Sequence, residues 1–338
     1  MKINKRLLSF IMVLLSTTII YAENSTPILG SINTEHYAEQ ITLNNSETRA
    51  YITNYSSGFV IIDISNSANP TIVSEFTQTD GGRVFDIALS ADNKTAYVAL
   101  DQDGILVLDI SNEHNIKELG SFNTNGRAKG VTLSSDGTKL FVADYFDGMV
   151  VLDVSNPTQP RKIGHYVTDY AHGGKVWDIV LSADGTKAYL ADHSKGLLIL
   201  NISNLNNISK IGEYDTAGIT LDVALTASED KAYVTDHSNG LVIIDISNPS
   251  APTKIGHFPS QDKAWRLALS GSEDKVFMAD RDAGLVSIDV SSPTAPVELA
   301  RESTGVYTFG VTLSSDSEKA YAADYYRGIS ILDLSLLP

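Results

Sequence analysis

The amino-acid sequence predicts an all-β protein, a ring of seven similar four-stranded sheets, and three observations lead to this prediction. A short apolar motif recurs seven times at nearly constant spacing. Each period contains four β-type segments separated by turn residues. The chain also begins with a segment that matches the one its last copy lacks. Together these observations favour a closed ring over an open solenoid.

The recurring motif is a glycine, an apolar run and an acid, as in GLVIIDIS at residues 240–247. Its apolar run is too short for a helix that must bury one face, so it is expected to be a strand buried on both faces. The seven glycines are 46, 44, 48, 44, 44 and 44 residues apart: Gly58, Gly104, Gly148, Gly196, Gly240, Gly284 and Gly328. A period near 44 residues indicates a repeat architecture.

Four segments of each period suit strands, which we name a to d in chain order. In one period they read RVFDIALS (83–90), TAYVAL (95–100), GILVLDIS (104–111) and IKELGSF (116–122). The a–b connections, such as SSDGTK, carry Asp and Gly, which accept the positive φ values of a tight hairpin. The c–d connections, such as SNPTQP, carry prolines that favour turns. Four antiparallel strands per repeat, without a helical period, predict the blade of a seven-bladed β-propeller.

The two ends of the chain are expected to share one blade. The last copy stops after GISILDLS (328–335) and lacks a d strand, whereas TPILGSIN (26–33) matches the Leu-Gly-Ser core of a d strand. Pairing the first strand with the last c strand removes an open sheet edge. The ring is therefore predicted to close with three strands from the C-terminal end and one from the N-terminal end.

Charge and composition limit the partners. Residues 1–22 have a basic start (Lys2, Lys5, Arg6), an apolar stretch and a small residue, Ala22, which predicts a secretory signal peptide followed by one propeller domain over residues 23–338. The formal charge is −16, so removing three positive residues leaves −16 − 3 = −19. Such a charge disfavours nucleic acid and anionic membranes. The chain has no cysteine, which excludes disulfides and thiol chemistry. We expect an exported protein, periplasmic or at the cell surface, without membrane insertion after signal removal.

The runs LVIID, LVLDI, VVLDV and LLILN resemble the LVIVD repeat family, a propeller-type repeat of exported or cell-surface proteins of bacteria and archaea. The resemblance covers essentially all of residues 27–335. It implies an exported β-propeller of unspecified partner and supplies no catalytic residue.

Comparing the seven copies separates scaffold from site. An Asx residue opens every b–c hairpin, from Asn54 and Asp101 to Asp324, and a second recurring acid lies in strand c, so both are interpreted as scaffold. The b–c and d–a loops differ between blades and are expected on one face, where binding usually resides. The predicted binding face comprises Tyr145, Phe146, Tyr170, His172, His193, His237, Arg281, Tyr307, Tyr325, Tyr326 and Arg327, beside Tyr55, Arg83 and Arg127.

Strand a holds two further sets of candidates. Asp86, Asp178 and Asp222 fall on strands next to the axis, where they are weak candidates to hold a cation, with pairing to Arg266 as the alternative. Trp177 and Trp265 share strand parity with core residues and are expected to pack between blades.

The favoured function is an interaction module that binds a protein or glycan at the cell envelope through the variable face. A hydrolase or lactonase with its site at the channel mouth is the alternative, and a purely structural surface protein is a third. No Ser-His-Asp motif, metal-ligand spacing or nucleophile elbow supports an enzyme, and no cofactor is expected.

Overall fold

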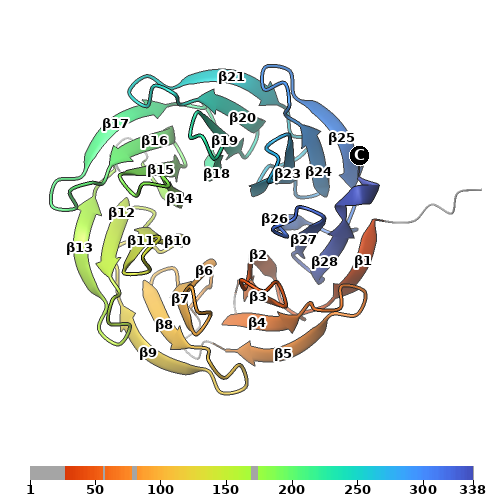
Figure 1. Ribbon diagram of the computed structural model, residues 1–338, viewed down its shortest axis with the longest axis horizontal. Helices are drawn as coiled ribbons and strands as arrows, with labels where there is room; N and C mark the ends of the chain where they lie inside the picture. The colour runs from red at the N-terminus through yellow and green to blue at the C-terminus, as the bar shows by residue number, and fades with distance from the viewer. Residues whose placement is uncertain (1–26, 56–57, 78–81, 169–173, 338) are drawn as a thin grey trace, which may run out of the picture.

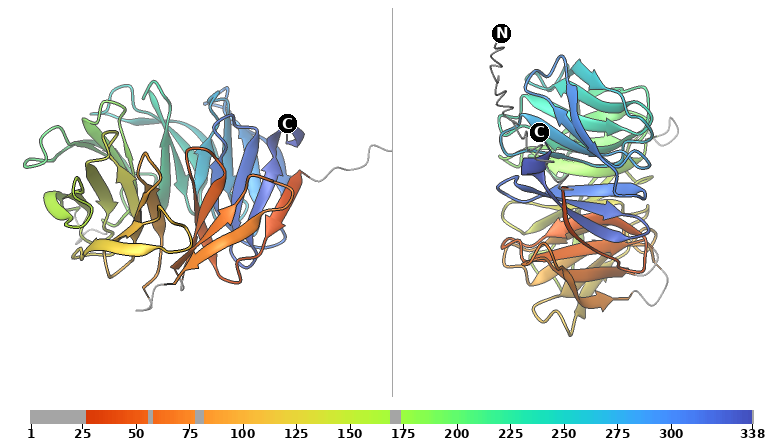
Figure 2. Two further views of the ribbon diagram at one scale, coloured as in Figure 1. Left: turned by 60° about the horizontal axis from the view of Figure 1, so that its bottom comes forward. Right: turned by 90° about the vertical axis from the view of Figure 1, so that its right-hand side faces the viewer.

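The computed structural model describes residues 27–55, 58–77, 82–168 and 174–337. Over these residues the chain forms seven antiparallel four-stranded sheets arranged as a ring, which confirms the predicted seven-bladed β-propeller (Figure 1). Seen edge-on, the ring is a flattened disc (Figure 2). The expected signal peptide, residues 1–22, lies outside the described residues. Within them, no helix has the length and apolarity needed to cross a bilayer.

Each blade runs outward from the axis in the order a, b, c, d. The innermost a strands are β2 (Ala38–Leu43), β6 (Asp86–Leu89), β10 (Gly130–Leu133), β14 (Val176–Leu181), β18 (Thr220–Leu225), β22 (Leu267–Leu269) and β26 (Thr308–Leu313). The b strands are β3 (Arg49–Asn54), β7 (Thr95–Ala99), β11 (Lys139–Ala143), β15 (Lys187–Asp192), β19 (Lys231–Asp236), β23 (Lys275–Ala279) and β27 (Lys319–Asp324).

The outer half of each blade comes from the two remaining strands. The c strands are β4 (Gly58–Asp63), β8 (Ile105–Asp109), β12 (Met149–Asp153), β16 (Gly196–Asn201), β20 (Gly240–Asp245), β24 (Leu285–Asp289) and β28 (Gly328–Asp333). The d strands are β5 (Thr71–Phe76), β9 (Lys117–Phe122), β13 (Arg161–Tyr166), β17 (Ser209–Tyr214), β21 (Thr253–Phe258), β25 (Val297–Glu302) and, for the last blade, β1 (Ile28–Ile32). A short 3-10 helix, η2 (Leu334–Leu336), follows β28.

The N-terminal strand closes the ring. Strand β1 pairs antiparallel with β28, with Ser31 opposite Ser330 and Ile32 opposite Ile329, and the two strands lie side by side in Figure 1. Blade 7 therefore consists of β26, β27, β28 and β1, as the matching sequence of residues 26–33 predicted. The closure leaves no c strand with an unpaired outer edge.

Close packing of neighbouring blades explains the glycine of the Leu-Gly-Ser core. A Cβ placed on Gly30 would lie 2.3 Å from the carbonyl oxygen of Ser67 in the c–d loop of blade 1. In blade 5, Gly256 approaches the carbonyl oxygen of Pro293 from blade 6 in the same manner. The glycine is needed because the loop of the next blade rests directly on the d strand.

The hydrophobic core is divided among the seven seams between blades. On β20, Leu241 and Ile243 pack with blade 6, whereas Val242 and Ile244 pack with blade 4, and all four are nearly fully buried. The seam between blades 7 and 1 has an equivalent cluster that includes Ile331. Burying such a side chain stabilises a fold by roughly 1.5–3 kcal/mol. Each blade therefore depends on both neighbours.

The packing of β1 can be tested with two valine substitutions. Gly30→Val forces a side chain against Ser67, and overpacking of this kind typically costs about 1–3 kcal/mol. Ser31→Val adds the same residue at an exposed position of the same strand. We expect thermal unfolding to show a lower melting temperature for Gly30→Val and little change for Ser31→Val. Equal melting temperatures would contradict the packing of β1 as the closing strand.

Candidate functional site

The b–c hairpins and the d–a loops emerge on one face of the ring, because successive strands of each blade alternate in direction. On this face a pocket of 380 Å³ opens at the channel mouth. Its lining comes from blades 1, 2, 3, 4, 6 and 7: Glu39, Tyr55, Arg83, Phe85, Arg127, Lys129, Tyr145, Trp177, Trp265, Phe309 and Tyr325. We call this the entrance pocket. Its volume is in the range of small-molecule sites.

The predicted binding-face residues fall in two groups around this pocket. The ring of Tyr145 lies 4.4 Å from that of Phe146 and 6.4 Å from that of His193, measured between ring centroids. On the far side, the ring of Tyr326 lies 4.9 Å from that of Tyr325 and 5.7 Å from that of Tyr307. Of the eleven predicted residues, Tyr145 and Tyr325 line the pocket itself.

The remaining predicted residues have other environments. His237 packs its ring 5.5 Å from that of Trp265. Arg281 lies over the ring of Tyr307, at 4.6 Å, and Arg327 donates to the carbonyl oxygen of Thr304. Tyr170 and His172 lie outside the described residues.

The prediction that Trp177 and Trp265 pack between blades is wrong. A β-bulge opens strand β14, where Val176 pairs with Asp192 and Asp178 with Ala191, so Trp177 has no partner and the alternation of sides is broken. Trp265 precedes β22 and, with Arg266, faces the single residue Ala279. Both indoles consequently project toward the axis.

Aromatic residues at the strand-a position of Trp177 and Trp265 form a layer across the channel. Phe85 of blade 2 contacts Trp177 of blade 4, with ring centroids 6.2 Å apart, and Trp177 contacts Trp265 of blade 6 at 6.3 Å. Trp265 in turn packs 4.6 Å from Phe309. Blades 2, 4 and 6 are not neighbours, so these side chains meet only at the axis.

The sequence did not predict this layer, because strand parity placed Trp177 and Trp265 between the blades and the following residue of strand a toward the axis. The position before it reads Glu39, Phe85, Lys129, Trp177, Leu221, Trp265 and Phe309 in blades 1 to 7. Such variation at one position of a repeat, rich in aromatic residues, is the sequence signal for this candidate site.

Three cations converge on the entrance pocket. The guanidinium of Arg127 makes two hydrogen bonds to Asp101, of 2.7 and 2.6 Å, and Lys129 Nζ donates to the same carboxylate at 2.9 Å. Arg83 stacks 4.3 Å above the ring of Tyr55 and makes no ion pair within the described part of the chain. The entrance pocket therefore carries positive charge in a chain whose formal charge is −16.

Burial changes the acidity of two pocket groups. It lowers the pKa of Lys129 to about 8, although Asp101 opposes this effect, and the ammonium lies 3.3 Å from the ring centroid of Phe85. Burial raises the pKa of Glu39 to about 7, against the nearby charges of Lys129 and Arg266. Glu39 is therefore partly protonated at neutral pH, which leaves the cations in excess.

The acids at the following position of strand a, Asp86, Asp178 and Asp222, are bound by other groups of the propeller. Arg266 Nη1 lies 3.0 Å from Asp222 Oδ1 and 3.6 Å from Asp178 Oδ1, which is the pairing that the sequence left as the alternative to a cation. Asp86 accepts from the backbone N–H of Val131 in the next blade. These groups line a separate cavity of 290 Å³ beyond the aromatic layer. Among the described residues, no three acidic or histidine side chains cluster as metal ligands.

The recurring acids are scaffold, as expected. Asp144 is fully buried and accepts from Thr124 Oγ1 at 2.6 Å and from the N–H of Gly126 at 2.9 Å, which ties the b–c hairpin to the d–a loop. In strand c, Asp153 accepts from the backbone N–H and the hydroxyl of Ser155. Asp101 is the exception, because its partners lie in the entrance pocket.

Comparisons with known proteins agree with this architecture. The family model described as "LVIVD repeat" matches residues 43–78, 81–124, 125–168, 173–216, 217–259 and 262–304. No curated protein matches the chain in sequence.

Solved structures with the same fold have little sequence identity to the chain. The β-propeller domain of Cps50 (Swd1) from Myceliophteria thermophila has a TM-score of 0.74 at 13% identity, covering 90% of this chain and 98% of that one. Hydrazine synthase from Kuenenia stuttgartiensis has a TM-score of 0.70 at 16%, covering 94% and 99%. The periplasmic gluconolactonase PpgL of Pseudomonas aeruginosa has a TM-score of 0.67 at 16%, covering 85% and 89%. At these identities the likeness is one of fold.

Buried carboxyls make stability depend on pH. Burial raises the pKa of Glu39 to about 7 and those of Asp86, Asp144 and Asp324 to about 6. Between the unfolded values near 4 and these folded values, the native state binds more protons, so the free energy of unfolding falls as pH rises from about 4 to 7. Exposed turn acids act oppositely at lower pH, because hydrogen bonds from Ser155 and Arg161 lower the pKa of Asp153 to about 2.

We therefore expect the melting temperature to be higher at pH 5 than at pH 8, and Glu39→Gln to reduce the difference. Scanning calorimetry of the unmodified protein and of Glu39→Gln between pH 5 and pH 8 measures these melting temperatures. A melting temperature that rises steadily from pH 5 to pH 8 would contradict the assignment of buried, raised-pKa carboxyls.

Proposed function

Because the chain belongs to the LVIVD repeat family and carries a cationic, aromatic pocket at its channel mouth, we propose that it is an exported binding protein for acidic glycans. The single observation that carries this proposal is the composition of the entrance pocket. The expected signal segment, residues 1–22, supports a location in the periplasm or at the cell surface, where glycans are available.

Aromatic side chains in the pocket suit a sugar ring. Tyr55, Tyr145 and Tyr325 stand at the rim, and the indole of Trp177 lies below them in the aromatic layer. The C–H faces of a sugar pack well on aromatic faces, whose quadrupole is negative. The tyrosine hydroxyls add hydrogen-bonding groups beside these apolar surfaces.

The cations favour a sugar that carries a carboxylate. A guanidinium binds a carboxylate through two parallel hydrogen bonds, and Arg83 is the pocket guanidinium that makes no ion pair among the described residues. Arg127 and Lys129 are already bound to Asp101. The sequence left protein and glycan partners open. A pocket of 380 Å³ favours the end of a glycan over a folded domain.

The test compares trigalacturonate with its methyl-esterified form, in which each carboxylate is replaced by an uncharged methyl ester. Isothermal titration calorimetry on the chain lacking residues 1–22 should show binding of the acid, weakening with salt, and much weaker binding of the ester. Arg83→Met should cost about 2 kcal/mol of binding, roughly 30-fold in affinity. Lys254→Ala removes an exposed cation from strand β21 and should have no effect. Equal binding of acid and ester, or binding of neither, would contradict the proposal.

A lactone hydrolase is the second candidate, because Glu39 has a pKa raised to about 7 in the entrance pocket. A carboxyl of that pKa is suited to general acid–base catalysis near neutral pH. Proton release from glucono-1,5-lactone distinguishes the two functions. Acceleration by the protein that is lost in Glu39→Gln would favour the hydrolase, and the spontaneous rate in both would favour the binding protein.

A further inference from the structure

A second ring of contacts joins the blades on the face opposite the entrance pocket. Each a–b hairpin has one residue with positive φ, between 53° and 59° where it is not glycine. Where this residue has a polar side chain, it accepts a hydrogen bond from the backbone of the preceding blade. The five pairs, acceptor first, are Glu47 with Ser315, Asn93 with Asn45, Glu229 with Ala183, Glu273 with Ala227 and Ser317 with Gly271.

Two blades lack this contact. Blades 3 and 4 have Gly137 and Gly185 at the same hairpin position, with φ of 68° and 66°, and a Cβ on either would meet no atom within 4 Å. Gly185 therefore supplies no acceptor to the backbone N–H of Ser135, the blade 3 residue that corresponds to Ala183.

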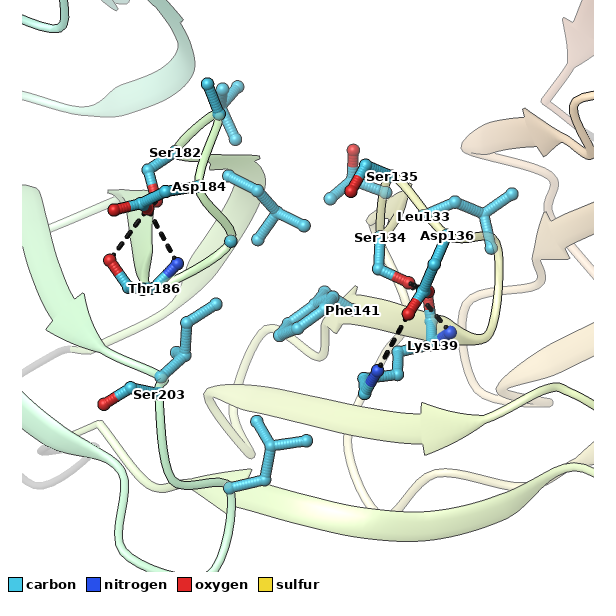
Figure 3. Close-up of a pocket in the computed structure, with 17 residues that line it drawn as sticks. Leu133, Ser134, Ser135, Asp136, Lys139, Phe141, Ser182, Asp184, Thr186 and Ser203 are labelled. Atoms are coloured by element: carbon cyan, nitrogen blue, oxygen red, sulfur yellow. Dashed lines mark hydrogen bonds and ion pairs between the residues drawn. The ribbon is translucent and has the colours of Figure 1, made fainter.

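The seam between blades 3 and 4 contains the cavity drawn in Figure 3, with a volume of 690 Å³. Phe141 stands between the two hairpins, with Ser135 and Lys139 on one side and Asp184 on the other (Figure 3). Gly185 lines the cavity as well. We call this the seam pocket.

Two residues of the seam pocket are more apolar than their counterparts in most other blades. Phe141 occupies a position that is tyrosine in five of the seven b strands, so the pocket lacks a hydroxyl there. Leu205 of the blade 4 c–d loop stands at a position that is proline in three of the six c–d loops, at Pro157, Pro249 and Pro293. Val180 and Leu181 complete the apolar wall. Three residues that differ from the commonest residue at their repeat position thus coincide in one seam: Gly185, Phe141 and Leu205.

The adjacent seam, between blades 4 and 5, provides a reference for the missing group. There the carboxylate of Glu229 accepts from the backbone N–H of Ala183 at 2.6 Å and lies 3.4 Å from Lys187 Nζ. The corresponding donors of the seam pocket are the N–H of Ser135 and the ammonium of Lys139, both of which line it.

We propose that the seam pocket binds a small carboxylate with an apolar body. The ligand carboxylate takes the place that Glu229 occupies in the next seam, on Ser135 and Lys139, and its apolar body packs on Phe141 and Leu205. This site is separate from the entrance pocket and does not depend on the proposed glycan binding.

The acidic residues beside Lys139 do not prevent a ligand carboxylate from binding there. Asp136 lies 3.3 Å from Lys139 Nζ, and its Oδ1 accepts from Ser134 and Thr138. The same arrangement occurs in the reference seam, where Lys187 Nζ is shared between Asp184, at 3.9 Å, and Glu229, at 3.4 Å. A cavity in a seam does not by itself indicate a carboxylate-binding site. The seam between blades 7 and 1 also has a cavity, of 540 Å³, but there the protein's own carboxylate, Glu47, lies in the wall.

The probes are octanoate and its uncharged analogue 1-octanol. We expect the chain lacking residues 1–22 to bind one octanoate at least tenfold more tightly than octanol by calorimetry, with a shift of the Ser135 amide resonance. Gly185→Glu places the protein's own carboxylate on the same donors, so it should weaken octanoate binding at least tenfold and leave the melting temperature equal or higher.

The matched control is Gly137→Glu, the same substitution in the neighbouring seam, which should leave octanoate binding unchanged. Arg83→Met should also leave it unchanged, which separates this site from the entrance pocket. If Gly185→Glu fails to fold, Lys139→Gln should weaken octanoate binding tenfold in its place. Equal affinity for octanol, full binding by Gly185→Glu or Lys139→Gln, or no binding by the unmodified chain would overturn the proposal.

Discussion

The burial of both faces of every sheet is the constraint on which the structure depends. Because strands such as β20 present apolar side chains to two neighbours, no blade covers its own core, and an open array would leave two apolar faces in water. Pairing of β1 with β28 resolves this by making the seam between blades 7 and 1 equivalent to the others. In a chain without cysteine, ring closure and burial supply the stability.

Ring closure also creates the two surfaces proposed as binding sites. It brings the first residues of seven strands to one axis, where a bulge such as that at Val176 and Asp178 turns an extra side chain inward. Trp177 and Trp265 meet at the axis and line the same pocket as Arg83 and Lys129. On the opposite face, the seam pocket arises where Gly185 omits a contact that Glu229 makes in the next blade.

Regular features of the fold were predictable from one sequence because the repeat supplies its own comparison. Period, strand order, ring closure and the scaffold role of residues such as Asp144 all follow from what the copies share. The differences between the copies led to the prediction that binding occurs on the face that carries the entrance pocket. The inward position of Trp177 was not predictable. The alternation of side chains between the two faces assumes an unbroken strand, and the sequence did not reveal the bulge that breaks it. The convergence of Arg83 and Lys129, 46 residues apart in sequence, likewise depends on the geometry of the ring.

We propose that the blade-specific residues at the axis form the binding site for an acidic sugar. A crystal structure of the chain soaked with trigalacturonate tests this most directly. The predicted result is a sugar ring against Tyr145 and Trp177, with its carboxylate on the guanidinium of Arg83. Ordered sugar on the outer d strands or in a blade seam, with the entrance pocket empty at saturating ligand, would contradict it.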